Sequence, residues 1–394
     1  MPTATSVTSP DQLFVQDAIE LPADPDVVVE GRASQHDAYP IFVTRSAEET
    51  LARLDELIST ARVAVISDRT VMRLHGNGFI NKLRGAEELS VYAIPPGESN
   101  KTLETAARLW DWLAAGSLGR RDIILTLGGG VINDLGGWVA SGYMRGVPYI
   151  NVPTTLIGQV DGAIGGKLAV NHGVAKNLIG GFRQPRGVVS NIGFLHTLDP
   201  RHLRAGIAET IKKAIIASPA YWDFIEEHID DLLAKDPEVM QRLVAYAGVI
   251  KTALIERDPY EHDSRRTLGF GHAVAHALET VTGYGPVLHG EAVSFGMTIE
   301  ARIALQRRLL ADHDFESIVT LLQRTGLPTS SSELAAEADG TAVLDAMRKI
   351  KLIRGGGLRL VLPLTVGETV IADDVTDTEI SAAFQAAGMT TTRA

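Results

Sequence analysis

The sequence predicts an α/β protein in two parts, an α/β half followed by a mostly α-helical half. In the first half, short apolar runs alternate with helical periods, which is typical of a parallel sheet covered on both faces. One apolar run leads directly into three glycines at 128–130. After about residue 197, long helical periods replace this alternation. We therefore expect an N-terminal arm over residues 1–40, an α/β domain over 41–197 and a helical domain over 198–394.

Five apolar runs of the α/β half are predicted to be strands, and the 3.6-residue period after the second run predicts a helix over 102–116. The strands are 61–68, 89–98, 122–130, 148–155 and 187–191. In the second half, Asp199-Pro200 is typical of a helix start. Helices are expected over 199–216, 221–234, 238–255, 289–308 and 317–326, with a strand pair near 358–372.

Composition excludes several classes of protein. The formal net charge of −11 argues against a nucleic-acid or membrane-surface partner, either of which favours a basic face. There is no cysteine, so a transition-metal site must use His, Asp or Glu. The first residues, MPTATSVTSPDQ, lack the features of a signal peptide, and no run of about 18 apolar residues occurs. We expect a partly disordered arm and a cytoplasmic protein.

Two glycine-containing loops follow predicted strands, where parallel sheets bind ligands. In LTLGGGVINDLGG the glycines let backbone amides approach a phosphate, and the helix that follows favours an anion. Asp134 lies in the first turn of that helix. PPGESNK, at 95–101, offers Glu98 and Lys101 to ribose and phosphate groups. The alternative is that both loops are ordinary structural turns.

Residues 152–182 are glycine-rich and apolar, yet they contain Asp161, Lys167, Lys176 and Asn177. Charges in such surroundings are costly to bury unless they are paired or bound to a ligand. Lysine and asparagine side chains suit a phosphorylated, hydroxylated substrate. A solvated loop is the alternative, which the apolar flanks disfavour.

A candidate metal site involves His272, His276 and His289, three of the eleven histidines. The first two are spaced i, i+4 and share a helical face, and neutral imidazole suits zinc and similar ions. Ordinary core or surface histidines are the alternative, and spacing leaves open whether His276 is a ligand or a proton-transfer group. Glu209 and Lys212, spaced i, i+3, form either a partly buried pair or a surface ion pair.

Further cations stand in apolar contexts, namely Lys251 and Arg265. With Lys167, Lys212 and Lys351 they could form a pocket for an anionic substrate. Alternatively, each could extend its charged end to the surface.

Together, PPGESNKTLE, GGGVINDLGGWVASGYMRGVPYINVPTTLIGQVDGAIGGK, AKNLIGGF, GIAETIK, FGHAVAHALE and LHGEAV resemble the sugar phosphate cyclases, whose central member is 3-dehydroquinate synthase. The likeness runs from about residue 60 to 365 in the same order. It implies a Rossmann-like NAD domain, a helical domain that carries zinc or cobalt, and a homodimer. It also implies transient oxidation of a sugar phosphate, phosphate elimination, reduction and an aldol closure to a carbocycle.

The resemblance also implies the roles of individual residues. The metal ligands would be Glu209, His272 and His289. His276 would bind the substrate phosphate or transfer a proton. Arg145 would reach the partner subunit's site. The NAD-binding residues would be Asp68, Glu98, Lys101, Gly129, Gly130, Val131, Asp134, Thr154, Thr155, Lys176, Phe194 and Thr197. The substrate-binding or catalytic residues would be Asp161, Lys167, Asn177, Lys212, Lys251, Arg265, His276 and Lys351.

The chain departs from the dehydroquinate synthase pattern at Gly269, where that enzyme has Asn, and at Arg183, where it has Tyr. His202 stands where Glu is usual and resembles the valiolone synthases, yet His276 is kept where 2-epi-5-epi-valiolone synthases have proline. We therefore expect a cyclase of the 2-epi-valiolone synthase type, acting on sedoheptulose 7-phosphate. The retained Lys251 and Arg265 keep dehydroquinate synthase as the alternative. A metal-dependent polyol dehydrogenase and a non-catalytic cyclase relative are hypotheses of other classes.

Overall fold

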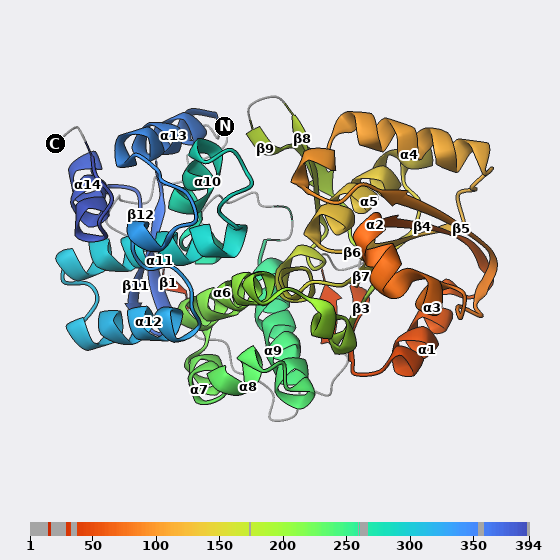
Figure 1. The fold of residues 1–394 in the computed structure, drawn as a ribbon, viewed down its shortest axis with the longest axis horizontal. Coiled ribbons are helices and arrows are strands. Elements are labelled where there is room, and N and C mark those ends of the chain that lie inside the picture. Colours follow the sequence, from red (N-terminus) through yellow and green to blue (C-terminus); the bar gives the residue numbers. More distant parts are fainter. Residues whose placement is uncertain are drawn as a thin grey trace, which may run out of the picture.

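The computed structural model describes residues 15–16, 29–32, 38–172, 175–258, 260, 267–353 and 358–391 (Figure 1). Arg265 and most of the predicted N-terminal arm lie outside these residues. Lys351 lies in a described helix, but its side chain does not belong to the described part.

The main sheet has seven strands, six of them parallel, as the apolar runs predict. Only the edge strand β2 runs antiparallel, to β3. All five predicted strands are confirmed, but β3 was missed because Pro40 interrupts its apolar run and proline disfavours a strand assignment. In spatial order the strands are β2 (Val29–Arg32), β3 (Ala38–Thr44), β10 (Gly187–Asn191), β7 (Tyr149–Pro153), β6 (Ile123–Gly128), β4 (Ala61–Asp68) and β5 (Ala86–Ile94).

Helices cover both faces of this sheet. Ala64 and Ile66 of β4 pack in one apolar cluster, and Val63 and Val65 pack in another, as the two-residue period of a strand requires. The first cluster includes α4 (Leu103–Ala115) and α5 (Gly130–Gly142). The second includes α1 (Ala47–Ile58) and α3 (Asn77–Ile80), while α2 (Arg69–Val71) lies between β4 and α3 in the chain.

The glycine-rich segment after β7 forms a short turn of helix, η4 (Gly158–Gly162), and a hairpin of β8 (Lys167–His172) and β9 (Ala175–Phe182). The solvated-loop alternative is wrong for the hairpin, because Leu168 and Val170 are buried in the cluster that contains α5. The hairpin lies between α5 and α10, near the top of Figure 1. It thus joins the sheet to the helical half.

The helical half is built around α6, whose residues from Ala205 to Ala217 are all buried. Asp199 caps this helix by accepting a hydrogen bond from the Arg201 N–H, which confirms the predicted helix start. The predicted helix over 221–234 is interrupted at His228 and forms α7 and α8. The helices are α6 (Pro200–Ala217), α7 (Pro219–Glu227), α8 (Ile229–Leu233), α9 (Pro237–Glu256), α10 (His272–Val281), α11 (His289–Gln306), α12 (Asp312–Arg324), α13 (Gly340–Ile353) and α14 (Asp377–Ala386).

A small antiparallel sheet completes this half, with β11 (Leu360–Thr365) and β12 (Glu368–Ala372) confirming the predicted strand pair. Its third strand is β1 (Val15–Gln16), from the predicted arm. The domain limit at 197/198 remains a prediction; η5 (Ile192–Thr197) ends there. Among the described residues, no helix is long and apolar enough to cross a bilayer.

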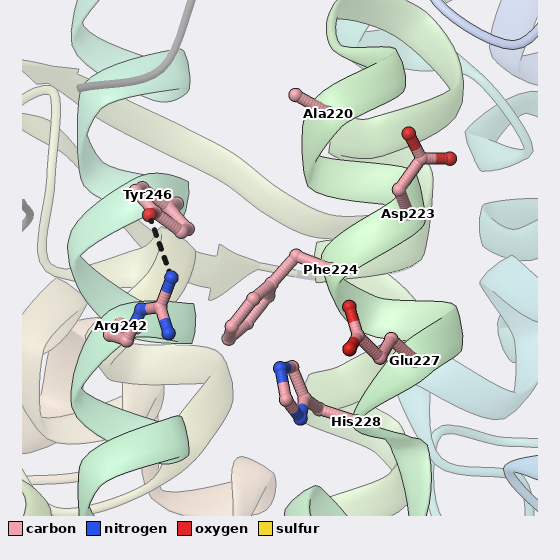
Figure 2. A pocket seen from close by; sticks show the side chains of 7 residues that line it. All are labelled: Ala220, Asp223, Phe224, Glu227, His228, Arg242 and Tyr246. Carbon is pink, nitrogen blue, oxygen red and sulfur yellow. Dashed lines mark hydrogen bonds between the residues drawn. The ribbon is translucent and has the colours of Figure 1, made fainter. Parts of the chain in front are cut away.

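A surface hollow of about 320 Å³ lies between α7 and α9 (Figure 2). The guanidinium of Arg242 lies 5.0 Å from the ring centroid of Phe224, and one of its N–H groups donates to the Tyr246 hydroxyl at 3.4 Å. None of its lining residues is a predicted site residue.

Candidate functional site

Close glycine contacts bring α6, α10 and α11 together. A Cβ added at Gly290 in α11 would lie 2.0 Å from the Ala205 carbonyl oxygen of α6. A Cβ added at Gly296 would lie 2.0 Å from the carbonyl oxygen of Gly271, the residue before α10. Only glycine permits such contacts at these two positions. The three helices therefore meet closely, and each contributes one predicted metal ligand.

The three predicted metal ligands face one another. Glu209 Oε1 lies 3.7 Å from His272 Nε2 and 3.6 Å from His289 Nε2. All three ligand atoms lie within 4.8 Å of one another. Two ligands held tetrahedrally at about 2.1 Å from one zinc ion are roughly 3.4 Å apart. The three groups therefore fit a divalent ion.

Hydrogen bonds orient both imidazoles. His272 Nδ1 lies 3.1 Å from the Phe270 carbonyl oxygen, and His289 Nδ1 lies 3.2 Å from Glu279 Oε2. With a hydrogen on Nδ1, each ring donates there and turns its Nε2 lone pair toward Glu209. Burial, helped by the Lys212 charge, holds the pKa of His272 well below its usual value. The neutral imidazole is the form that binds metal.

Glu279, which sequence reasoning missed, links this cluster to the hairpin. Its second oxygen accepts from Lys176 at 3.1 Å. Burial alone would raise the pKa of Glu279, but His289 and Lys176 together hold it far below its usual value. A carboxylate behind a ligating histidine is the usual outer partner of a metal site. Its only signal in the sequence is its place at the end of GHAVAHALE.

His276 borders the same cluster. Its ring centroid lies 5.3 Å from that of His272 and 6.0 Å from that of His289. His276, Glu279 and His289 form a second set of groups that could hold a metal. His272, His276 and His289 therefore lie in one cluster, as a shared site requires.

Glu209 and Lys212 form a buried ion pair, so the surface-pair alternative is wrong. Lys212 Nζ lies 2.6 Å from Glu209 Oε2, and the side chains are 2% and 1% exposed. Burial would raise the pKa of Glu209, but Lys212 and other neighbouring cations lower it below its usual value. Within the described residues, neither Glu209 oxygen has a hydrogen bond of regular geometry. A buried carboxylate in this state fits a metal ligand.

Asp161 joins two further lysines. Lys213 Nζ and Lys251 Nζ each lie 3.0 Å from its Oδ1 atom. Burial lowers the pKa of Lys251 to about 8 although Asp161 acts to raise it. Lys167 is exposed at the start of β8 and close enough to influence Lys251 electrostatically. Lys213 is fully buried and was not predicted; a second lysine in ETIKKA was its only signal.

Part of the predicted NAD site is held by a polar network. The buried Lys101 Nζ lies 2.5 Å from Asp134 Oδ2 and 2.5 Å from Asn177 Oδ1. Burial raises the pKa of Asp134, and Lys101 partly offsets this. Asn171, which was not predicted, donates to Glu98 Oε1 at 2.9 Å. Asn177, predicted to meet substrate, thus also supports Lys101.

The carboxyl ends of the parallel strands bring the other predicted NAD residues together. α5 begins at Gly130 after β6, and no side chain caps its N-terminus. In the part of the chain that the structure describes, a Cβ at Gly130 would meet nothing within 4 Å, whereas one at Gly129 would lie 2.9 Å from Thr155 Cγ2. An uncapped helix start beside open space fits a phosphate group. The same edge carries Asp68 at the end of β4, Val131 in α5, and Thr154 after β7.

The two predicted NAD residues of η5 differ in exposure, since Phe194 is buried and Thr197 is exposed. The Phe194 ring is buried and packs edge-on against Phe79, with ring centroids 5.4 Å apart. Thr197 Oγ1 lies 2.8 Å from Nε2 of His75, another residue not predicted. Arg145 is exposed in η3 (Tyr143–Arg145).

Comparisons with known proteins agree with this geometry. The 3-dehydroquinate synthase N-terminal model matches residues 91–205 and the C-terminal model matches residues 206–351. The chain is 47% identical over 377 residues to a 2-epi-valiolone synthase of Actinosynnema mirum, covering 95% of this chain and 98% of that one. It is 39% identical over 347 residues to a 3-dehydroquinate synthase of Desulforamulus reducens, covering 88% and 96%.

A solved structure is similar along most of the chain. It is a 2-epi-5-epi-valiolone synthase from Streptomyces hygroscopicus with NAD⁺ and Zn²⁺ bound. The TM-score is 0.83 at 30% identity, with 91% of this chain and 98% of that chain covered.

Proposed function

Because the chain belongs to the 3-dehydroquinate synthase family, we propose that it is an NAD- and metal-dependent sugar phosphate cyclase. It is a carbon–oxygen lyase that eliminates phosphate from a seven-carbon ketose phosphate and closes a carbocycle. The observation that carries this proposal is the cluster of Glu209, His272 and His289 beside buried lysines.

Zn²⁺ or Co²⁺ would be held by Glu209, His272 and His289, and NAD by the N-terminus of α5 and the strand ends around it. When bound, NAD supplies reversible hydride transfer, and the metal ion supplies a Lewis acid for a substrate oxygen. Two observations support these assignments: the uncapped start of α5, and Glu209 Oε1, which has no hydrogen bond among the described residues and faces both imidazoles.

The chain's own residues orient the sugar phosphate. Lys212 and Lys251 place positive charge beside the metal ligands, and Lys167 adds an exposed ammonium at the start of the hairpin. Asp161 turns a partly exposed carboxylate toward the same region and can accept from a substrate hydroxyl. His276 borders the metal cluster, and its imidazole can move a proton during elimination.

The preferred substrate is sedoheptulose 7-phosphate. Gly269 directly precedes Phe270, whose carbonyl accepts from His272, so it stands next to the metal cluster. Among the described residues, which leave out 261–266, a Cβ at Gly269 would meet only Val361 Cγ2, at 4.0 Å. The position has room for a side chain but offers no donor to a carboxylate, which favours a neutral hydroxymethyl group.

The second candidate is 3-dehydroquinate synthase, which acts on a sugar acid phosphate. The 39% identity to the Desulforamulus reducens enzyme and the retained Lys251 favour it. The polyol dehydrogenase hypothesis is weaker, because a simple polyol carries no phosphate group for the buried lysines to bind.

A cytoplasmic homodimer is part of the proposal. The net charge of −11 disfavours a nucleic-acid or membrane partner. Met144 and Arg145 are exposed next to each other in η3, which supports a contact with a partner subunit there.

The test follows phosphate release from sedoheptulose 7-phosphate by purified protein with metal and catalytic NAD⁺. We expect many turnovers per NAD⁺ and no net absorbance of NADH. Stoichiometric NADH without phosphate release would favour a dehydrogenase instead, and phosphate release only from the sugar acid would favour dehydroquinate synthase.

A further inference from the structure

Lys213 is a fully buried ammonium group that the proposed mechanism does not use. It lies on α6 directly after Lys212, yet the two side chains have different first partners. Lys212 Nζ contacts Glu209 Oε2 at 2.6 Å, whereas Lys213 Nζ contacts Asp161 Oδ1 at 3.0 Å and stays 3.8 Å from Glu209 Oε2. Its side chain is 0% exposed, so it cannot touch a substrate directly.

Lys213 joins elements that come from the two halves of the chain. Asp161 belongs to η4, which leads from β7 into the hairpin, and Glu209 belongs to α6. Lys251 of α9 reaches the same carboxylate oxygen at 3.0 Å and also donates to the Asp161 carbonyl oxygen at 2.5 Å. Two lysines from two helices therefore fix one residue of η4.

In this arrangement the second carboxylate oxygen of Asp161 is available to a ligand. Among the described residues, the closest contacts of its carboxylate with Lys213 and Lys251 are both made by Oδ1. The Asp161 side chain is nevertheless 30% exposed, so part of the carboxylate is open. An anchored Oδ1 and an open Oδ2 suit a group that accepts from a ligand in a fixed direction.

We propose that Lys213 is a positioning residue, which orients Asp161 for the substrate and sets its distance from the metal-ligand carboxylate of Glu209. The inference rests on the proposed function, because Asp161 is the group that meets the sugar. Without Lys213, the Asp161 carboxylate could rotate slightly. It would still bind the substrate but would orient it less well, so kcat should fall by a larger factor than KM rises.

The charges of this cluster stay balanced when Lys213 is replaced by a neutral residue. The cluster contains the ammonium groups of Lys212, Lys213 and Lys251 and the carboxylates of Asp161 and Glu209. Lys213→Met removes one cation and leaves two cations with two anions, while the unbranched side chain fills a similar space. Exposed Lys82, in the turn after α3, provides the matched control Lys82→Met.

The experiment is a double-mutant cycle of Lys213→Met and Asp161→Asn, with metal content, NAD⁺ affinity and melting temperature measured for every variant. We expect Lys213→Met to bind one metal per chain and to lower kcat by about 10- to 100-fold with a small change in KM. In the Asp161→Asn background the same replacement should change kcat by less than about threefold. Lys82→Met should match the wild type.

Several results would overturn the inference. They are an unchanged kcat, an additive cycle, or a loss of activity that follows lost metal or a lower melting temperature. If Lys213→Met does not fold, Lys213→Gln enters the cycle in its place. If the wild type cyclises neither sugar, the proposed function fails, and a crystal structure of Lys213→Met decides the inference. An unmoved Asp161 carboxylate would refute it, and a rotated one would support it.

Discussion

Replacing Glu279 by Gln should weaken metal binding without removing any predicted ligand. Glu279 Oε2 accepts from His289 Nδ1 at 3.2 Å, and its other oxygen accepts from Lys176 at 3.1 Å. Glutamine has nearly the same shape and can still accept from the imidazole. It removes the negative charge that stabilises a metal-bound histidine.

The expected magnitude follows from the hydrogen bond that changes. Bonds to charged groups contribute about 1.5–3 kcal/mol and neutral ones about 0.5–1.5 kcal/mol, so the charge is worth roughly 1–2 kcal/mol here. Glu279 is nearly fully buried, so solvent screens this difference little. The metal dissociation constant should rise about 5- to 30-fold.

The assay titrates Zn²⁺ into metal-free protein against a chromophoric chelator at neutral pH. The matched control is Glu379→Gln, which removes a carboxylate paired with Arg307 at 2.6 Å outside the candidate site. The control should lower the melting temperature slightly and leave zinc affinity unchanged. A Glu279→Gln protein with wild-type zinc affinity would refute the proposed role of Glu279 behind His289.

Three further predictions concern His289, Gly269 and Glu300. His289→Ala should abolish both bound metal and turnover, and stoichiometric metal in this variant by elemental analysis would contradict the ligand assignment. Gly269→Asn should raise kcat/KM for the sugar acid relative to sedoheptulose 7-phosphate, since the site has room for the amide; an unchanged ratio would show that Gly269 does not select the substrate. Burial raises the pKa of Glu300 from 4.5 to about 8, with the Gly271 and Val361 N–H groups opposing the shift. The folded state therefore binds the extra proton, and the stability it contributes is present below about pH 4.5 and lost as the pH rises through about 8. The melting temperature of Glu300→Gln should therefore rise relative to that of the wild type as the pH goes from mildly acidic to alkaline. A difference in melting temperature that does not change with pH would show that Glu300 is ionised throughout.

Most of the sheet could be predicted because buried parallel strands read as continuous apolar runs. β3 could not, since Pro40 breaks its run and its partner β10 lies 143 or more residues later in the chain. The hairpin of β8 and β9 could not be predicted because its sequence is rich in glycine, and the strand conformation of these glycines depends on packing against α5. Its burial is a tertiary property that no local pattern contains.

The candidate site divides in the same way. Glu209, His272 and His289 belong to long motifs, so sequence alone could bring them into one hypothesis. Lys213 directly follows one motif and Glu279 ends another, but their roles depend on partners that meet them only where α6, η4, α10 and the hairpin come together. Partners of functional groups are therefore harder to predict than the groups themselves.

The most direct test of the central claim is kcat/KM for sedoheptulose 7-phosphate against 3-deoxy-D-arabino-heptulosonate 7-phosphate, under identical metal and NAD⁺. The open position at Gly269 predicts that the neutral sugar is cyclised in preference, with the product identified as a carbocycle by NMR. A preference of about tenfold or more for the sugar acid, equivalent to about 1.4 kcal/mol in transition-state binding, would contradict the claim and identify a divergent dehydroquinate synthase.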